Sequence, residues 1–111
     1  METLKEKESD IQNSICEYLQ IRGRCFFRVN NIPAFNRQDG GGITMRRLPK
    51  FQPKGIPDLI VVAGGLFFGL EVKTKIGRQS PEQKEFEANV KKHGGKYFVV
   101  RSIEDVQAIG L

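Results

Sequence analysis

Tryptophan is absent from this chain, histidine occurs once and cysteine only twice. Cys16 and Cys25 are not spaced as a CxxC pair, and His93 lies far from both in the sequence, so the chain lacks the ligands for a zinc site. We expect both cysteines to be reduced, packed thiols. The run Gly40-Gly41-Gly42 is not followed by Gly-Lys-Ser/Thr, which excludes a phosphate-binding P-loop.

Long hydrophobic runs are also missing. No stretch approaches the ~18–20 apolar residues of a membrane span, and the first six residues lack the apolar core of a signal peptide. We therefore expect a cytoplasmic location, which for a phage-encoded chain means the host cytoplasm. Charge is plentiful: 18 Lys and Arg against 13 Asp and Glu give a net +5, which suits a polyanionic partner such as DNA. The length of 111 residues predicts a single domain, residues 1–111, with one modest core.

The stretch 54–73 holds two strand patterns joined by a tight turn at Ala63-Gly64-Gly65. The resulting hairpin brings Asp58, near the start of the first strand, opposite the end of the second. Glu71 and Lys73 share one face there, because strand side chains alternate. Two carboxylates and one ammonium group then converge at the edge of a sheet, which suits a divalent cation. The alternative is a surface cluster of salt bridges.

Hydrophobic periodicity and capping motifs predict the remaining helices and strands. Ile11, Ile15 and Leu19 mark an amphipathic helix that ends at Gly23, with its start open between the capping boxes Thr3-x-x-Glu6 and Ser9-x-x-Gln12. A second helix begins at Ser80-Pro81 and stops at Gly94-Gly95, and a short third one follows Ser102. Strands are predicted over 25–31 and 96–101. The order predicts a small α/β domain with a mixed sheet flanked by helices.

Basic residues gather in a long segment without convincing periodicity, about 33–54. Its cations are Arg37, Arg46, Arg47, Lys50 and Lys54, against one acid, Asp39. Flexible glycine among these cations favours a loop that closes on a nucleic-acid backbone; a merely solvated loop is the alternative.

Four further residues are candidates for contact with DNA. Lys75 and Arg78 form a second basic turn. Arg28 and Asn30 share a face of the first strand, where they contact phosphate or simply face solvent.

Pro57-Asp58 followed by Glu71-Val72-Lys73 resembles the PD-(D/E)XK nuclease signature. Together with Gly55-Ile56 before it, and Ser80-Pro81-Glu82-Gln83 and Phe86 after it, the pattern resembles the VRR-NUC branch of that superfamily, from the first helix to Val100. The resemblance implies a restriction-endonuclease-like core and a Mg²⁺-dependent endonuclease, with Mn²⁺ able to substitute. It further implies cutting of branched DNA, with Holliday junction resolution by a homodimer as the expected reaction. The alternatives are a flap or nicking endonuclease, a catalytically silent nucleic-acid-binding module, or a structural subunit of a partner nuclease.

Several residues receive roles from this chemistry. Asp58, Glu71 and the backbone carbonyl of Val72 are the expected metal ligands, and Lys73 is an electrostatic group near the scissile phosphate rather than a free base. The resemblance adds Glu8 as a helix-borne ligand, with Asp10 as the fallback and a solvated glutamate as the plain alternative.

Two further assignments stay open. Gln83 either caps its helix or reaches the active site, and the resemblance favours the site. The eight phenylalanines are many for one small core, so Phe67, Phe68 or Phe98 could line a dimer interface instead.

Overall fold

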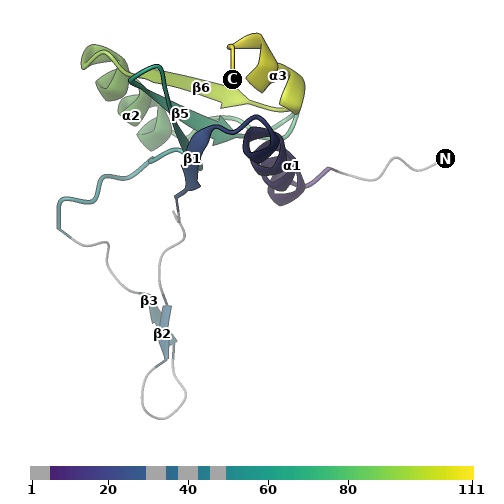
Figure 1. Ribbon diagram of the computed structural model, residues 1–111. Helices are drawn as coiled ribbons and strands as arrows, with labels where there is room; N and C mark the ends of the chain where they lie inside the picture. The colour runs from purple at the N-terminus through teal and green to yellow at the C-terminus, as the bar shows by residue number, and fades with distance from the viewer. Residues whose placement is uncertain (1–5, 30–34, 38–42, 46–49) are drawn as a thin grey trace.

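A four-stranded mixed sheet forms the centre of the computed structural model, which describes residues 6–29, 35–37, 43–45 and 50–111 (Figure 1). The strand order is β1-β4-β5-β6. The strands are β1 (Cys25–Arg28), β4 (Leu59–Ala63), β5 (Leu66–Val72) and β6 (Lys96–Val100). Neighbours pair antiparallel except β5 and β6, which are parallel and joined through a helix. The helices are α1 (Glu8–Ile21), α2 (Pro81–Lys92) and α3 (Ile103–Ala108). The predicted α/β class with a mixed sheet is confirmed.

The β4–β5 hairpin sets the register of the sheet. Gly64 and Gly65 adopt φ of +58° and +77°, a left-handed conformation that glycine reaches without steric cost and that two-residue hairpin turns require. Leu59 then pairs with Leu70. The next position outward therefore sets Asp58 opposite Glu71, as the sequence predicts.

The two faces of the sheet differ in their cover. One face packs against α1 and α3 and contains the hydrophobic core, whose buried members are Ile11, Ile15, Leu19, Leu59, Val61, Leu70, Val72, Val100, Val106 and Leu111. The other face carries Gly69, Glu71 and Tyr97, and α2 lies over its β5–β6 side, where the ring of Phe86 is 6.4 Å from that of Tyr97. Strand alternation thus separates the core from the face that carries the predicted acids.

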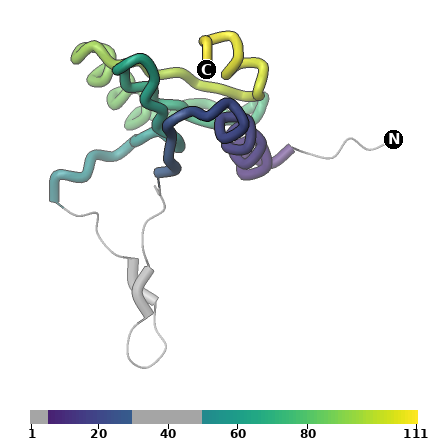
Figure 2. Tube along the Cα trace, in the orientation of Figure 1, coloured from purple at the N-terminus to yellow at the C-terminus, as the bar shows by residue number. Residues whose placement is uncertain are grey.

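The helix ends agree with the sequence at α2 and differ at α1. Ser80 caps α2 in a capping box, as predicted, and the ring of His93 at the other end of this helix contacts Asn89 O at 2.9 Å. Helix α1 begins after Lys7, and among the described residues no side chain caps it, so both predicted boxes are wrong. Its other end is fixed because Arg22 and Arg24 donate to the Leu111 carbonyl at 3.2 and 3.1 Å, holding the yellow end of the trace in Figure 2.

Three expectations need correction. The segment predicted as a loop contains an antiparallel pair, β2 (Phe35–Arg37) and β3 (Ile43–Met45), whose three-residue strands are too short to give a convincing periodicity. Cys25 is exposed at the start of an edge strand, so only Cys16 is a partly packed thiol, and both are free.

The third correction concerns the phenylalanines. Phe68 and Phe98 stack at 6.3 Å and pack, partly buried, against the core, and Phe67 is also partly buried, so none of the three is a fully exposed side chain. Within the described part of the chain, no helix is long and apolar enough to cross a membrane.

Candidate active site

The site is organised by two carboxylates that face each other across the β4–β5 hairpin. Asp58 immediately precedes β4, and its Oδ2 accepts a hydrogen bond from the Val72 backbone N–H at 2.8 Å. This bond fixes the aspartate at the end of β5, beside Glu71. The N–H and C=O of one strand residue point to the same side of the strand, so the Val72 carbonyl is directed toward Asp58 as well. Three oxygen donors therefore converge at one corner of the sheet.

Glu71 is the buried member of the pair, with 1% of its surface exposed. Its Oε1 accepts a hydrogen bond from Gln83 Nε2 at 2.8 Å and lies 3.6 Å from Lys73 Nζ. Its Oε2 accepts a longer bond, 3.3 Å, from the hydroxyl of Tyr97. The carboxylate is thus held on both oxygens by side chains from α2, from β6 and from Lys73, the residue that follows β5.

The electrostatic balance at Glu71 disfavours negative charge. Burial, followed by the charge of Asp58 and a hydrogen bond with it, raises the pKa of Glu71 from 4.5 to about 8, although Lys73 and Tyr97 act in the opposite direction. Burial therefore outweighs the ion pair with Lys73. The pKa of Tyr97 is raised too, first by burial and then by the charge of Glu71, so its hydroxyl remains a hydrogen-bond donor. Lys73 and Tyr97 therefore do not compensate the negative charge that Asp58 and Glu71 carry when both are ionised.

Gln83 fills both roles that the sequence leaves open. Its amide oxygen accepts from the Ser80 backbone N–H at 2.8 Å, while its own backbone N–H donates back to Ser80 Oγ at 3.2 Å, which completes the capping box. The amide nitrogen of the same side chain reaches Glu71. One glutamine therefore starts α2 and orients the buried carboxylate.

Lys73 lies just beyond β5, with 13% of its side chain exposed. Its backbone N–H donates to Val100 O at 3.1 Å, which extends the β5–β6 pairing by one residue. The turn that follows is held by Arg101, whose guanidinium donates to the carbonyls of Thr74 and Gly77. The ammonium is thereby kept on the same face as Glu71, as alternation predicts.

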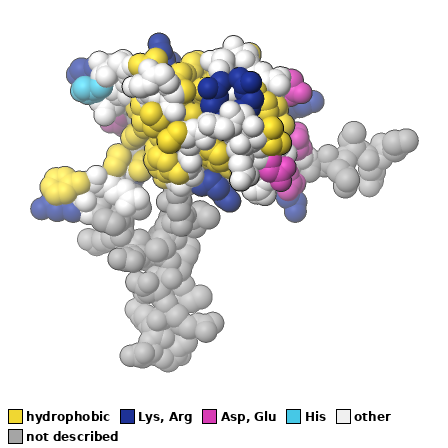
Figure 3. All heavy atoms as spheres, in the orientation of Figure 1, with side chains coloured by type: hydrophobic (Ala, Val, Ile, Leu, Met, Phe, Trp, Pro, Cys, Tyr) yellow, Lys and Arg dark blue, Asp and Glu magenta, His cyan; other side chains and the backbone are white. Residues whose placement is uncertain are grey.

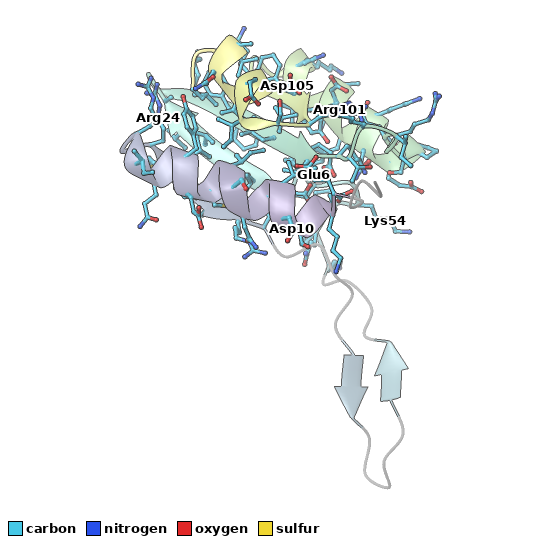
Figure 4. All side chains as sticks on the ribbon, turned by 90° about the vertical axis from the view of Figure 1, so that its right-hand side faces the viewer. Glu6, Asp10, Arg24, Lys54, Arg101 and Asp105 are labelled. Atoms are coloured by element: carbon cyan, nitrogen blue, oxygen red, sulfur yellow. The ribbon has the colours of Figure 1, made fainter. Side chains whose placement is uncertain are left out.

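These side chains line an open pocket of about 390 Å³. Its lining residues are Glu8, Gln52, Pro53, Lys54, Gly55, Ile56, Asp58, Glu71, Lys73, Ser80, Glu82 and Gln83. Glu8, exposed at the start of α1, belongs to this lining, whereas the fallback Asp10 does not. Figure 4 shows Glu6 and Asp10 at the end of α1 that lies nearest Lys54.

The wall of the pocket depends on a close backbone approach. Gly55 has φ of +77°, and a Cβ at this position would lie 2.3 Å from the Glu82 carbonyl oxygen in the first turn of α2. Only glycine fits there, so the segment before Asp58 packs directly on the start of the helix that carries Gln83.

The donor set suits a hard divalent cation, although it is not a complete metal cage. Among the residues the structure describes, no group of three or more His, Cys, Asp and Glu side chains is close enough to hold a metal ion. Asp58, Glu71 and the Val72 carbonyl offer oxygen, and Mg²⁺ commonly takes only one or two carboxylates and keeps several waters. The raised pKa of Glu71 fits a site whose negative charge a cation would balance.

The expected DNA-contacting residues are spread more widely. Lys54 lines the pocket, and Lys50, Lys75 and Arg78 are among the residues outside the core. Arg28 is exposed on β1, where it pairs with Leu59 beside Asp58, outside the pocket lining. The remaining candidates, Asn30, Arg46, Arg47 and the side chain of Arg37, lie outside the described residues.

Sequence reasoning missed Tyr97 as part of the site. The sequence identifies this residue only as an aromatic in the last strand. The parallel register pairs Tyr97 with Gly69, which puts it on the face of Glu71 and two positions away along β5. Strand alternation predicts that Tyr97 and Phe98 point to opposite faces of the sheet, but it does not predict which of the two lies on the face of Glu71.

The fold can now be compared with known structures. A solved structure described as a VRR_NUC domain superposes with a TM-score of 0.62, 23% identity, and coverage of 92% of this chain and 91% of its own. The chain has the fold of a VRR_NUC domain. A second, described as a VRR_NUC domain protein, gives a TM-score of 0.61 at 18% identity, covering 96% of this chain and 86% of its own. No protein-family model and no curated protein matches the sequence. The VRR_NUC fold that the motifs predicted is therefore confirmed by structure.

Proposed function

We propose that this chain is a divalent metal-dependent endodeoxyribonuclease that hydrolyses phosphodiester bonds. The observation that supports it most directly is the pairing of Asp58 with a buried, amide-held Glu71 across the hairpin, with Lys73 on the same face. A surface cluster of salt bridges would leave its acids solvated, whereas Glu71 is 1% exposed and faces an open pocket. The VRR_NUC fold adds support from an independent direction.

Mg²⁺ is the proposed metal, with Mn²⁺ able to substitute. Asp58, Glu71 and the Val72 carbonyl would hold it, and Glu8 would add a carboxylate from α1 across the pocket. When bound, such an ion supplies Lewis acidity toward a phosphoryl oxygen and lowers the pKa of a water molecule. These oxygen donors match the preference of a hard cation.

The protein's own side chains supply orientation and charge. Gln83 and Tyr97 hold the two oxygens of Glu71, so the carboxylate does not rotate when substrate enters. Lys73 keeps a positive charge 3.6 Å from Glu71, positioned to stabilise negative charge that develops on phosphate. The ion pair with Glu71 assigns Lys73 an electrostatic role rather than that of a free base.

We further propose branched DNA as the substrate, with Holliday junction resolution by a homodimer. Resolution needs two cuts on opposing strands, and this chain offers one site, so a C2 pair is the simplest assembly that provides both. Because Phe68 and Phe98 are partly buried against the core, the more exposed apolar side chains Phe27, Val62 and Leu66 on β1 and the hairpin are better candidates for the contact. A protein that acts in this way on host or phage DNA would work in the cytoplasm.

The decisive experiment is cleavage of end-labelled duplex, flap, fork and four-way junction DNA by the purified chain, with Mg²⁺ or with EDTA. Asp58→Asn should abolish cutting while leaving DNA binding in EDTA intact, and Glu104→Gln, an exposed acid on α3, should cut like the wild type. Cleavage that persists in EDTA or in Asp58→Asn would refute the assignment. Binding without cleavage under every condition would make the chain a silent binding module, and cuts confined to flaps or single nicks would replace junction resolution with the flap or nicking reaction.

The basic segment is tested separately through salt dependence. Neutralising Arg46 and Arg47 should reduce the slope of log K against log salt by about one per lost phosphate contact. An unchanged slope would show that these two arginines do not touch DNA.

A further inference from the structure

Phe51 is a large aromatic side chain that the folded chain leaves almost entirely in solvent. It is 93% exposed, the highest value among the exposed large hydrophobic residues of the described ranges. Its backbone φ is +70°, and within those ranges it is the one non-glycine residue with a positive φ. The conformation is strained for a residue with a bulky side chain, and the exposure forgoes the free energy of burying a ring. The fold itself gains nothing evident from a phenylalanine here.

A cation lies over the ring, and a second follows close by in the sequence. The Lys50 ammonium lies over it, 5.6 Å from the ring centroid, and Lys54 follows three residues later in the chain. On the face seen in Figure 3, hydrophobic and basic side chains protrude together at the left-hand edge, where the segment 50–54 runs. Proteins bind single-stranded nucleic acid with aromatic rings beside cations, because bases stack on the ring while phosphates pair with the cations.

The ring directly precedes, in the chain, residues that line the candidate active-site pocket. Gln52, Pro53 and Lys54, which directly follow Phe51, line that pocket, and Gly55 fixes the segment on the first turn of α2. Three residues of extended chain span at most about 10 Å between Phe51 and Lys54. A stacked strand advances about 3.4 Å per nucleotide, so the ring is within about three nucleotides of a phosphate bound near Lys54.

We infer that Phe51 is a stacking platform for an unpaired base within about three nucleotides of a phosphate bound near Lys54, at the candidate active-site pocket. The inference rests on the proposed nuclease function and adds a specificity determinant to it. A base inside a continuous duplex is covered on both faces by its neighbours, whereas a base at a branch point or in a flap can leave the stack and cover the ring. The residue therefore favours DNA with an unpaired strand at the cleavage position over intact duplex.

The absence of tryptophan from the chain allows a direct test. The Phe51→Trp variant has its single indole at the platform, and stacking of a base on that indole quenches its emission. Ile21→Trp is the matched control, because Ile21 is 86% exposed but lies at the opposite end of α1 from Glu8. The 14 residues of this helix correspond to about 20 Å. In Figure 4, Arg24, just beyond this end of α1, lies far along the helix from Glu6 and Lys54.

Titrations in EDTA keep the DNA uncut and compare a flap with a duplex of the same sequence. We expect the flap to quench the indole emission of the Phe51→Trp variant strongly and the duplex to quench it weakly. Neither DNA should change the emission of the Ile21→Trp variant. Equal quenching of the two variants, or equal quenching of the Phe51→Trp variant by flap and duplex, would overturn the inference.

Affinity gives an independent measurement. Phe51→Ala should weaken flap binding about 5- to 150-fold, the range for loss of one stacked base, with duplex binding unchanged and Phe51→Tyr close to wild type. An equal loss on both substrates would refute a base-stacking role.

The inference and the proposed function can fail separately. Quenching of the indole at position 51 in a chain that never cleaves DNA would uphold the platform and reject the nuclease. Metal-dependent cleavage by a chain whose indole at position 51 does not respond to flap DNA would uphold the nuclease and reject the platform.

Discussion

Glu71 makes the stability of the metal-free protein depend on pH in an unusual direction. Because its pKa rises from 4.5 to about 8 in the folded state, the fold binds more protons than the unfolded chain between these two values. The free energy of unfolding must therefore fall as pH rises through this interval, whereas carboxylates with lowered pKa values produce the opposite slope. Relative to pH values below 4.5, the loss at pH 7 is at most about 3 kcal/mol, at 1.36 kcal/mol per pH unit.

Glu71→Gln removes the charge and keeps the shape. The new amide oxygen can still accept the hydrogen bond from Gln83, and the new amide N–H can donate to the Tyr97 hydroxyl. In EDTA at pH 7 we expect the variant to be more stable than the wild type by up to about 3 kcal/mol, which corresponds to a melting temperature about 10–20 °C higher. The difference should become small near pH 4.5 and vanish below it, where the wild-type carboxyl is largely protonated in both the folded and the unfolded state.

Thermal or urea unfolding followed by circular dichroism at pH 5, 6, 7 and 8 measures this difference. Glu104→Gln, which removes an exposed acid from α3, should retain the wild-type slope. Added Mg²⁺ at pH 7 should stabilise the wild type and leave Glu71→Gln unchanged, because only the wild type offers the paired carboxylates. A wild-type stability that is flat or rises from pH 5 to 8 in EDTA would refute the argument that burial dominates at Glu71.

Other predictions follow from single contacts. Lys73→Ala should lower the cleavage rate about 10²- to 10³-fold with little change in DNA affinity. If the cleavage rate and the DNA affinity fall in proportion, Lys73 only anchors phosphate. Gln83→Glu retains an acceptor for the capping box but loses the N–H donor to the carboxylate of Glu71. The variant should keep its helix content in circular dichroism and lose DNA cleavage. Retained cleavage would show that the contact between the Gln83 amide and Glu71 is dispensable. Gly55→Ala should destabilise the fold by about 2 kcal/mol or more in urea unfolding, because the new Cβ would collide with the Glu82 carbonyl oxygen. Gly64→Ala should destabilise it less, because Gly64 also has a positive φ but a Cβ there would have no neighbouring atom within 4 Å. Equal costs for the two glycine variants would contradict the close approach.

The part of the site that could be predicted from sequence is the part formed locally. Asp58 and Glu71 face each other because a two-glycine turn fixes the register of one hairpin, and strand alternation then puts Lys73 on the same face. The start of α2 is equally readable, since the cap, the proline and the glutamine are adjacent in the sequence. These features depend on interactions between residues that are close in the chain.

What sequence reasoning missed depends on long-range register or on weak local signals. The face of Tyr97 is decided by the parallel pairing of β6 with β5, which no pattern within β6 reveals. The strands of the β2–β3 pair have three residues each, too few for periodicity to identify them. At α1 two capping boxes compete, and the helix begins at a residue that belongs to neither as its cap. For Gln83 the sequence suggests a choice between two roles, whereas the two ends of its amide serve both.

We expect the hairpin also to set the order in which the site forms during folding. Asp58 and Glu71 are close in the chain and meet as soon as the β4–β5 turn closes, an event of microseconds for a hairpin. Tyr97 and Glu8 arrive later, because closing longer loops costs more conformational entropy and helix α2 must first pass over the sheet. Glu71 is therefore still hydrated when the acids first meet, and its desolvation comes with the docking of α2 and β6. The nascent chain must bury this carboxylate in its last folding steps, so protonation or an available divalent cation should speed the final docking in refolding experiments.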